Sequence, residues 1–314
     1  MTLTTITPEL PRDRWGRPLV TPPDGGKPVP YTRCTKFVDA LEDKYNLSKW
    51  QQRMVALGLV GRSDLQLAVA AHRDDKGKLN KIVDEAMEEA RAGAAATIGT
   101  ALHSLTEAFD RGEQMPSYPD TYRADLNAYA TATKPLKMLP EYIERFMVHD
   151  PLRIGGTPDR IVELAGRRYI ADLKTGSVDY AIGKIAQQLA VYAHSVTYDH
   201  VTGTREPVEG VDQDTAIVIH LPAGTGTCEL ISVDIAAGWE AVQLSAKVRA
   251  WRSRKNLHAP LDAVAVARRA RALELIDAAD HPDDLNDVYR DHVDVWTDDL
   301  TVAGAARKAE LTGN

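Results

Sequence analysis

The stretch GGTPDRIVELAGRRYIADLKTG (residues 155–176) decides the fold, because it predicts two short strands joined by a tight turn. Its two halves are rich in β-branched and aromatic residues, and Ala165–Gly166 lies between them as a turn signal. If the loop has two or four residues centred there, Asp159 lies directly across from Asp172, with their Cβ atoms about 5 Å apart. A three-residue loop would shift this register. The hairpin is therefore the first structural prediction.

The second half of the hairpin places two charged side chains on one face. In RRYIADLK the alternation of a strand directs Ile170, Asp172 and Lys174 the same way. Two facing carboxylates repel each other, and burying them unpaired would cost several kcal/mol. A divalent cation relieves both problems, and hard oxygen ligands suit Mg²⁺ or Mn²⁺. Carboxylate, carboxylate and lysine together favour metal-assisted phosphodiester hydrolysis.

The alternative interpretation is a half-exposed ion pair between Asp172 and Lys174 at a strand edge. An acidic residue two before a lysine is weak evidence alone, because the chain contains it three times, at Glu42–Lys44, Asp74–Lys76 and Asp172–Lys174. Only the third lies on a predicted strand that follows a GxxD hairpin arm. The hairpin geometry thus carries the functional interpretation.

Upstream, GTALH (residues 99–103) lies in a predicted helix. The expected buried stripe of this helix comprises Ile98, Leu102, Leu105 and Phe109. Gly99 lies one turn before His103 on the same face, where a missing side chain lets a strand or ligand approach. A lone helical histidine is more often a surface or satisfied core residue, but a glycine in mid-helix costs roughly 1 kcal/mol and calls for a reason.

Two further groups are candidates for contact with nucleic acid. Gln188 and Tyr192 in QLAVY share a helix face and could grip a backbone or stack on a base, although Tyr192 alone suggests the edge of a core. A basic helix near the end of the core is the best candidate for phosphate contacts, with a solvated helix face as the alternative. Its residues are Lys247, Arg249, Trp251, Arg252, Arg254 and Lys255.

Composition sets outer limits. The 314 residues include 45 acidic and 38 basic side chains, a formal net charge of -7, which excludes a strongly basic, histone-like binder but not a local basic groove. No apolar run approaches the roughly 20 residues that span a bilayer, and no signal-peptide core is present, so we expect a cytoplasmic protein with no membrane partner. Two cysteines are too few for a disulfide framework or an iron–sulfur cluster.

The order of predicted elements is helices, a mixed α/β centre, then helices. We expect an extended arm (1–30), a helical region (31–95), a core (96–256) and a C-terminal helical region (257–314). One long helical stretch is predicted over residues 79–112. The C-terminal region holds seven aspartates and one arginine between His281 and Leu300, which predicts soluble surface, a wall that repels DNA or a partner-binding region.

Four motifs in order, GTALH, GGTPD, DLKTG and QLAVY, resemble the RecB-like branch of the PD-(D/E)XK nuclease superfamily, which includes CRISPR-associated exonucleases and phage recombination nucleases. The resemblance covers roughly residues 90–255. It implies an α+β fold whose restriction-endonuclease-like core is a short mixed sheet flanked by helices, with helical extensions at both ends. Members with an iron–sulfur cluster need four cysteines, so this chain resembles a cluster-free member.

The resemblance also implies residue roles. His103, Asp159, Asp172 and the backbone carbonyl of Leu173 would ligate Mg²⁺ or Mn²⁺, and Lys174 would be the catalytic lysine. Gln188 and Tyr192 would form the DNA-side motif. Glu144, at the head of ERFMV, would correspond to an accessory acid on the first core strand.

The expected function is a metal-dependent exodeoxyribonuclease acting on DNA ends, in phage-type recombination or DNA processing, with DNA and a recombination protein as partners. If the chain is phage-encoded, its compartment is the host cytoplasm. The alternatives are an endonuclease or flap nuclease with the same site, a catalytically silent DNA-binding scaffold, and a generic α/β protein whose resemblance is spurious.

Overall fold

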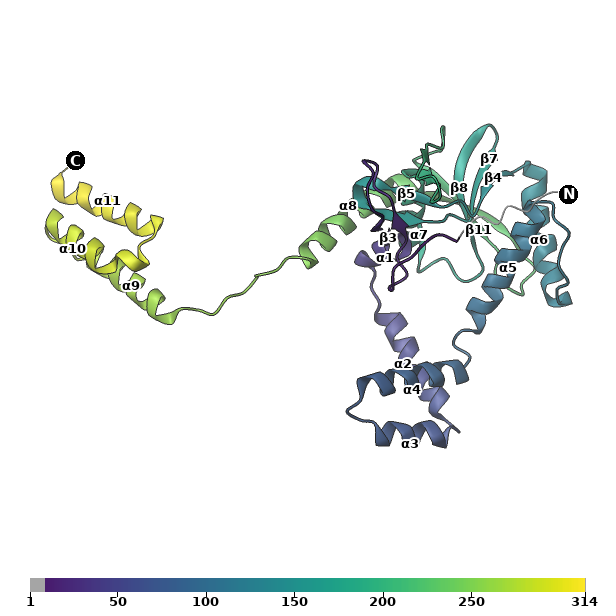
Figure 1. Cartoon of the computed structure of the whole chain (residues 1–314), viewed down its shortest axis with the longest axis horizontal. Coiled ribbons are helices and arrows are strands. Elements are labelled where there is room, and N and C mark those ends of the chain that lie inside the picture. Colours follow the sequence, from purple (N-terminus) through teal and green to yellow (C-terminus); the bar gives the residue numbers. More distant parts are fainter. Residues whose placement is uncertain (1–8, 314) are drawn as a thin grey trace. The chain divides into compact units, whose positions relative to one another are not determined.

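The computed structural model describes residues 9–313, so the first eight residues of the predicted arm lie outside the described part. Contacts divide the chain into one unit that ends at Ser253 and a second that begins at Arg254 (Figure 1). The first unit combines two mixed five-stranded sheets with helices. This arrangement confirms the predicted α+β class.

The central sheet holds the predicted hairpin. Its strands, in spatial order, are β12 (Glu229–Asp234), β11 (Thr215–His220), β8 (Arg167–Lys174), β7 (Arg160–Leu164) and β4 (Leu139–Ile143). The β11–β8 pair is parallel, and the other three pairs are antiparallel. The sheet is therefore mixed, with the hairpin strands β7 and β8 inside it.

The hairpin register agrees with the prediction. Arg160 pairs with Ala171 and Leu164 with Arg167, which leaves a two-residue loop at Ala165 and Gly166. Both loop residues have positive φ, 53° and 79°. This is the conformation that matches the twist of a tight hairpin, and glycine adopts it without steric cost. The local sequence thus fixes the register.

A second five-stranded sheet shares no strand with the central sheet. Its order is β10 (Arg205–Glu206), β9 (Val196–Tyr198), β5 (Met147–His149), β6 (Ile154–Gly156) and β3 (Thr32–Arg33), with only β3–β6 parallel. A separate two-stranded ribbon is formed by β1 (Leu19–Val20) and β2 (Val29–Pro30). The predicted arm thus contributes β1 and β2, and the residues that follow it supply an edge strand.

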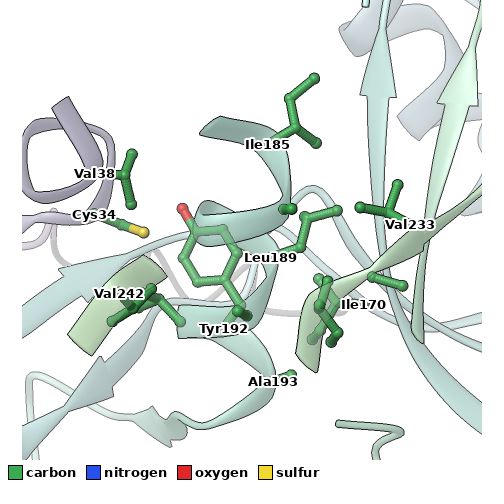
Figure 2. Packing of buried hydrophobic residues seen from close by; sticks show 14 of the residues in the cluster. Cys34, Val38, Ile170, Ile185, Leu189, Tyr192, Ala193, Val233 and Val242 are labelled. Carbon is green, nitrogen blue, oxygen red and sulfur yellow. The ribbon is translucent and has the colours of Figure 1, made fainter. Parts of the chain in front are cut away.

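Helices cover both faces of the central sheet. They are α5 (Ala94–Asp110), α6 (Arg123–Thr133), α7 (Ile182–Ala193) and α8 (Ile235–Arg252). Leu102 of α5 and Tyr129 of α6 pack with Leu173 of β8 in one core cluster. Ile170 of the same strand packs with α7 residues in another, as Figure 2 shows. Side chains along β8 therefore alternate between the two faces of the sheet as predicted, with Ile170 on one face and Leu173 on the other.

The N-terminal helices differ from the prediction in one place. They are α1 (Cys34–Val38), α2 (Tyr45–Leu59), α3 (Ser63–Ala71) and α4 (Lys76–Glu89). The single helix expected over residues 79–112 is broken, because α4 ends at Glu89 and α5 begins at Ala94. Arg91 has a φ of 55°, which no helix interior accommodates. Helix propensity alone did not reveal this break, since every residue type around it is common in helices except Gly93.

The second unit consists of α9 (Ala263–Asp277), α10 (Pro282–His292) and α11 (Asp298–Thr312), packed around Ile276, Leu285 and Leu300. Short 3₁₀ turns complete the chain: η1 (Asp39–Leu41), η2 (Asp120–Tyr122), η3 (Lys134–Leu136), η4 (Asp150–Leu152) and η5 (Val293–Val295). Over residues 9–313 no single helix is long and apolar enough to cross a membrane; α2 and α3 reach that length only as a pair bent by 112°.

Candidate active site

The hairpin brings two aspartates together at one end of β7 and β8. Asp159 precedes Arg160, whose partner is Ala171, so the next position outward faces Asp172. The Asp159 carboxylate accepts a hydrogen bond of 2.8 Å from the Leu173 backbone N–H. Burial raises the pKa of Asp159, while this hydrogen bond favours its ionised form. The structure therefore brings together the carboxylates that the sequence predicted.

Asp172 is the buried member of the pair, with 2% of its surface exposed. Burial, followed by repulsion from Asp159, raises its pKa to about 6. Lys174 Nζ lies 2.5 Å from Asp172 Oδ2, yet this oxygen accepts no well-directed hydrogen bond from the described residues. The contact is thus an ion pair that leaves a buried carboxylate oxygen without a directed donor. The Lys174 ammonium offsets part of the cost of burying this oxygen, and a cation held between the two aspartates would offset more of it.

His103 reaches the pair from α5. Its Nδ1 atom lies 3.4 Å from Asp159 Oδ2, and burial lowers the pKa of the imidazole. A neutral imidazole keeps a lone pair available for a metal or a proton. A Cβ atom at Gly99 would lie 2.8 Å from Thr175 Oγ1, just beyond β8, so glycine permits the close approach of α5. The predicted stripe is wrong at Ile98, which is 37% exposed.

Glu144 lies near the aspartates but not where the sequence placed it. It follows β4 directly with a φ of 53°, and its N–H donates to the Asp159 carbonyl at 3.1 Å. The ERFMV strand begins only at Met147 and belongs to the second sheet. Partial burial, then the charge of Asp159, raises the pKa of Glu144 to about 7. The prediction that the strand begins at Glu144 is therefore wrong, because Glu144 lies between β4 and β5, although its carboxyl group borders the site.

Sequence reasoning missed Glu107. It lies one helical turn after His103 on α5, and its charge raises the pKa values of both Asp159 and Glu144. With His103, Glu144 and Thr175 it lines an open pocket of about 460 Å³. The spacing HxxxE on a predicted helix was the available signal, because residues four apart share a face.

The sequence analysis also missed a buried hydrogen-bond network around Arg160, next to the site. Arg160, next to Asp159, is fully buried and donates to Asp110 at 2.5 Å and to Thr106 at 2.9 Å. The Tyr129 hydroxyl donates to the same Asp110 carboxylate. This network ties β7 to α5 and α6, so it fixes the helix that carries His103 against the strand that follows Asp159.

Tyr192 does not occupy the DNA-facing position predicted for it. It is 3% exposed and lies in the core beside Cys34, Leu189 and Val242 (Figure 2). A Cβ atom at Gly156 would lie 2.8 Å from the Tyr192 hydroxyl, so the tyrosine packs directly on the strand that leads to Asp159. Tyr192 therefore offers little surface for direct contact with DNA. Gln188 is half-buried, and its carbonyl accepts a weak bond from the Cys34 thiol.

The predicted basic helix is shorter than expected. Helix α8 ends at Arg252, so Arg254 and Lys255 lie outside it, in the second unit. Arg249 is partly engaged, since its guanidinium lies over Phe37 and donates to the Lys36 carbonyl. Lys247 and Arg252 are exposed. Only these two remain on the helix as free surface cations.

No known protein-family model matches the chain, and no curated protein is significantly similar to it. The arrangement of the site is therefore interpreted from its own chemistry.

The donor set fits a hard divalent cation. Two facing carboxylates are oxygen ligands of the kind that Mg²⁺ or Mn²⁺ prefers, and the His103 imidazole adds a nitrogen donor beside them. In residues 9–313 no three His, Cys, Asp or Glu side chains are already gathered around one point. Lys174 and the Leu173 N–H contact the carboxylates instead.

Proposed function

We propose that the protein is a divalent-metal-dependent deoxyribonuclease, acting as an exonuclease on DNA ends. The observation that carries this proposal is the hairpin register, which sets Asp159 opposite Asp172 with Lys174 against the second carboxylate. The approach of His103 to Asp159 adds a nitrogen donor. The Lys174 ion pair and the Leu173 N–H offset part of the cost of burying the two carboxylates together, but the pKa values of both remain raised.

His103, Asp159, Asp172 and the Leu173 carbonyl would hold the Mg²⁺ or Mn²⁺ ion. When bound, the ion supplies Lewis-acid polarisation of the phosphate and lowers the pKa of water. The protein's own contribution begins with Lys174, whose ammonium group can orient water or neutralise charge that develops on the phosphate oxygens.

Glu144 and Glu107 contribute negative charge and proton exchange at the edge of the site. Because the pKa of Glu144 is about 7, this carboxyl can take up or release a proton near neutral pH. In the hydrolysis, a water molecule gives up one proton as its oxygen bonds to phosphorus, the P–O bond to the leaving nucleotide breaks, and the leaving oxygen takes up a proton. Glu144, whose carboxyl group borders the site, is suited to such a proton transfer.

Incubation of linear DNA with Mg²⁺ or Mn²⁺ tests the proposal. Lys174→Met should abolish degradation, since it removes the ammonium group beside Asp172. Lys76→Met is the matched control, because Asp74–Lys76 has the same spacing but lies outside the hairpin, at the start of α4. Full activity of Lys174→Met would refute the assignment, as would inactivity of the wild-type protein with both metals. Cutting of covalently closed circular DNA, which has no ends, would show that the protein is an endonuclease and not an exonuclease.

A further inference from the structure

The end of β11 lies directly beside Lys174. This strand runs parallel to β8, and its last residue, His220, pairs with Lys174. Val218 of β11 and Ile170 of β8 pack in the same core cluster, and side chains two or four positions further along a strand leave the same face. The His220 and Lys174 side chains therefore lie on the same face of the central sheet.

Two backbone hydrogen bonds continue this pairing beyond β11. The Lys174 carbonyl accepts from the Leu221 N–H at 2.8 Å, and the Thr175 carbonyl accepts from the Ala223 N–H at 3.1 Å. Leu221 is fully buried, and the loop after it is tied to α6, because the buried Asp125 carboxylate accepts hydrogen bonds from two of its N–H groups. The residues that bond to Lys174 and Thr175 are thus themselves fixed in the core.

The His220 side chain supplies a third bond to the segment after β8. Its Nε2 atom lies 3.0 Å from the Gly176 carbonyl oxygen. A carbonyl oxygen only accepts hydrogen bonds, so this ring nitrogen carries a hydrogen atom and donates it. The three successive carbonyl groups of residues 174–176 are therefore each bonded to a residue between 220 and 223. Of these three bonds, only the one from His220 comes from a side chain, so a substitution can remove it alone.

We propose that His220 is a positioning residue that holds the segment after β8 and so keeps Lys174 in place for catalysis. The Lys174 side chain is 31% exposed, and among the described residues its ammonium group forms an ion pair only with Asp172. Because a lysine side chain is long and flexible, its position depends on a fixed backbone. The inference rests on the proposed nuclease function and assigns His220 no contact with metal or DNA.

Steady-state cleavage of linear DNA with Mn²⁺ tests this role. His220→Leu removes the donor, and we expect kcat to fall about tenfold with KM unchanged, the size of effect that one hydrogen bond produces. His220→Gln should retain most of the activity, since the glutamine amide can donate from a similar place but cannot exchange protons as an imidazole does. His220 is half-buried, and melting curves verify that both variants fold.

Hydrogen exchange in EDTA measures the same contact without cleavage. The backbone amides of residues 177–181 should exchange faster in His220→Leu than in the wild type, and His220→Gln should resemble the wild type. His281→Leu is the matched control, because His281 also bonds to the backbone, accepting from the Asp283 N–H at the start of α10. This control should change neither kcat nor the exchange of residues 177–181.

Full kcat in His220→Leu would overturn the proposal and leave the nuclease in place. Unchanged exchange of residues 177–181 in that variant would also overturn it. Equal losses of kcat in the leucine and glutamine variants would show that the imidazole itself takes part in the reaction, which contradicts a positioning role. A wild-type protein that cleaves no DNA with either metal would instead refute the nuclease function, and the catalytic role of His220 with it.

Discussion

The ionised side chain of Asp172 destabilises the folded protein. The carboxyl is nearly fully buried, faces Asp159, and has a pKa of about 6 in the folded protein. An unfolded chain ionises the same group near pH 4. Folding therefore favours the protonated form. This contribution to stability is fully present below about pH 4 and is lost as the pH rises through 6.

Asp172→Asn should consequently stabilise the protein at pH 8 while abolishing cleavage. Asparagine cannot ionise, so the variant avoids burying a charge, and we expect a gain on the order of 1–3 kcal/mol in the free energy of unfolding. The gain should shrink towards pH 4. Urea unfolding in EDTA at pH 5 and pH 8 measures it.

Asp125→Asn is the control for burial alone. The Asp125 carboxylate is also fully buried, but it accepts hydrogen bonds from the N–H groups of Gly224 and Gly226, both at 2.8 Å. An amide offers only one acceptor oxygen, so this variant should lose stability. Asp172→Asn proving less stable than the wild type at pH 8 would contradict the account of Asp172.

Among the helices and strands, the β7–β8 hairpin could be predicted from the sequence, whereas the short strands around it could not. The Ala165–Gly166 turn and the alternation in RRYIADLK are local signals, and they sufficed for the register of Asp159 against Asp172. Strands of two or three residues, such as β3 and β6, carry no such signal, so apart from the ERFMV strand the second sheet escaped prediction.

The buried and polar partners of the site required the tertiary structure. No local sequence signal shows that Arg160 is a core residue. Nor does one show whether Tyr192 is a core side chain or a DNA contact. Both outcomes depend on the residues that pack against these side chains in the folded protein. Glu107 was also missed, although its helical spacing from His103 was a local signal for it. Glu144 was misplaced because β4 ends immediately before it, and the connection to β5 follows.

The Arg160–Asp110 pair should be the main tie between β7 and α5. Arg160→Met leaves the Asp110 carboxylate largely buried without its cation, and breaking a buried pair costs about 3–5 kcal/mol. We expect that loss in urea unfolding. Arg268→Met, which breaks an exposed pair with Asp294, should cost less than about 1 kcal/mol. Equal effects of the two substitutions would show that the buried network does not hold the helix.

The whole molecule consists of two units joined by an exposed segment. Residues 254–261 are exposed and outside helices and strands, and they include Arg254 and Lys255. Limited trypsin digestion should therefore cut first at these two residues, since exposed irregular segments are the preferred sites of nicking. Lys247, inside α8, should be cut later. Mass spectrometry of the early fragments identifies the site, and a first cut within α8 would contradict the division.

Binding of Mn²⁺, measured by calorimetry, tests the central claim most directly, because it asks whether the paired carboxylates hold a metal apart from any activity. The wild-type protein should bind Mn²⁺, and both Asp159→Asn and Asp172→Asn should lose that binding. Lys174→Met should bind at least as tightly as the wild type, since its ammonium group no longer competes for Asp172. Unchanged Mn²⁺ affinity in the two asparagine variants would contradict the claim.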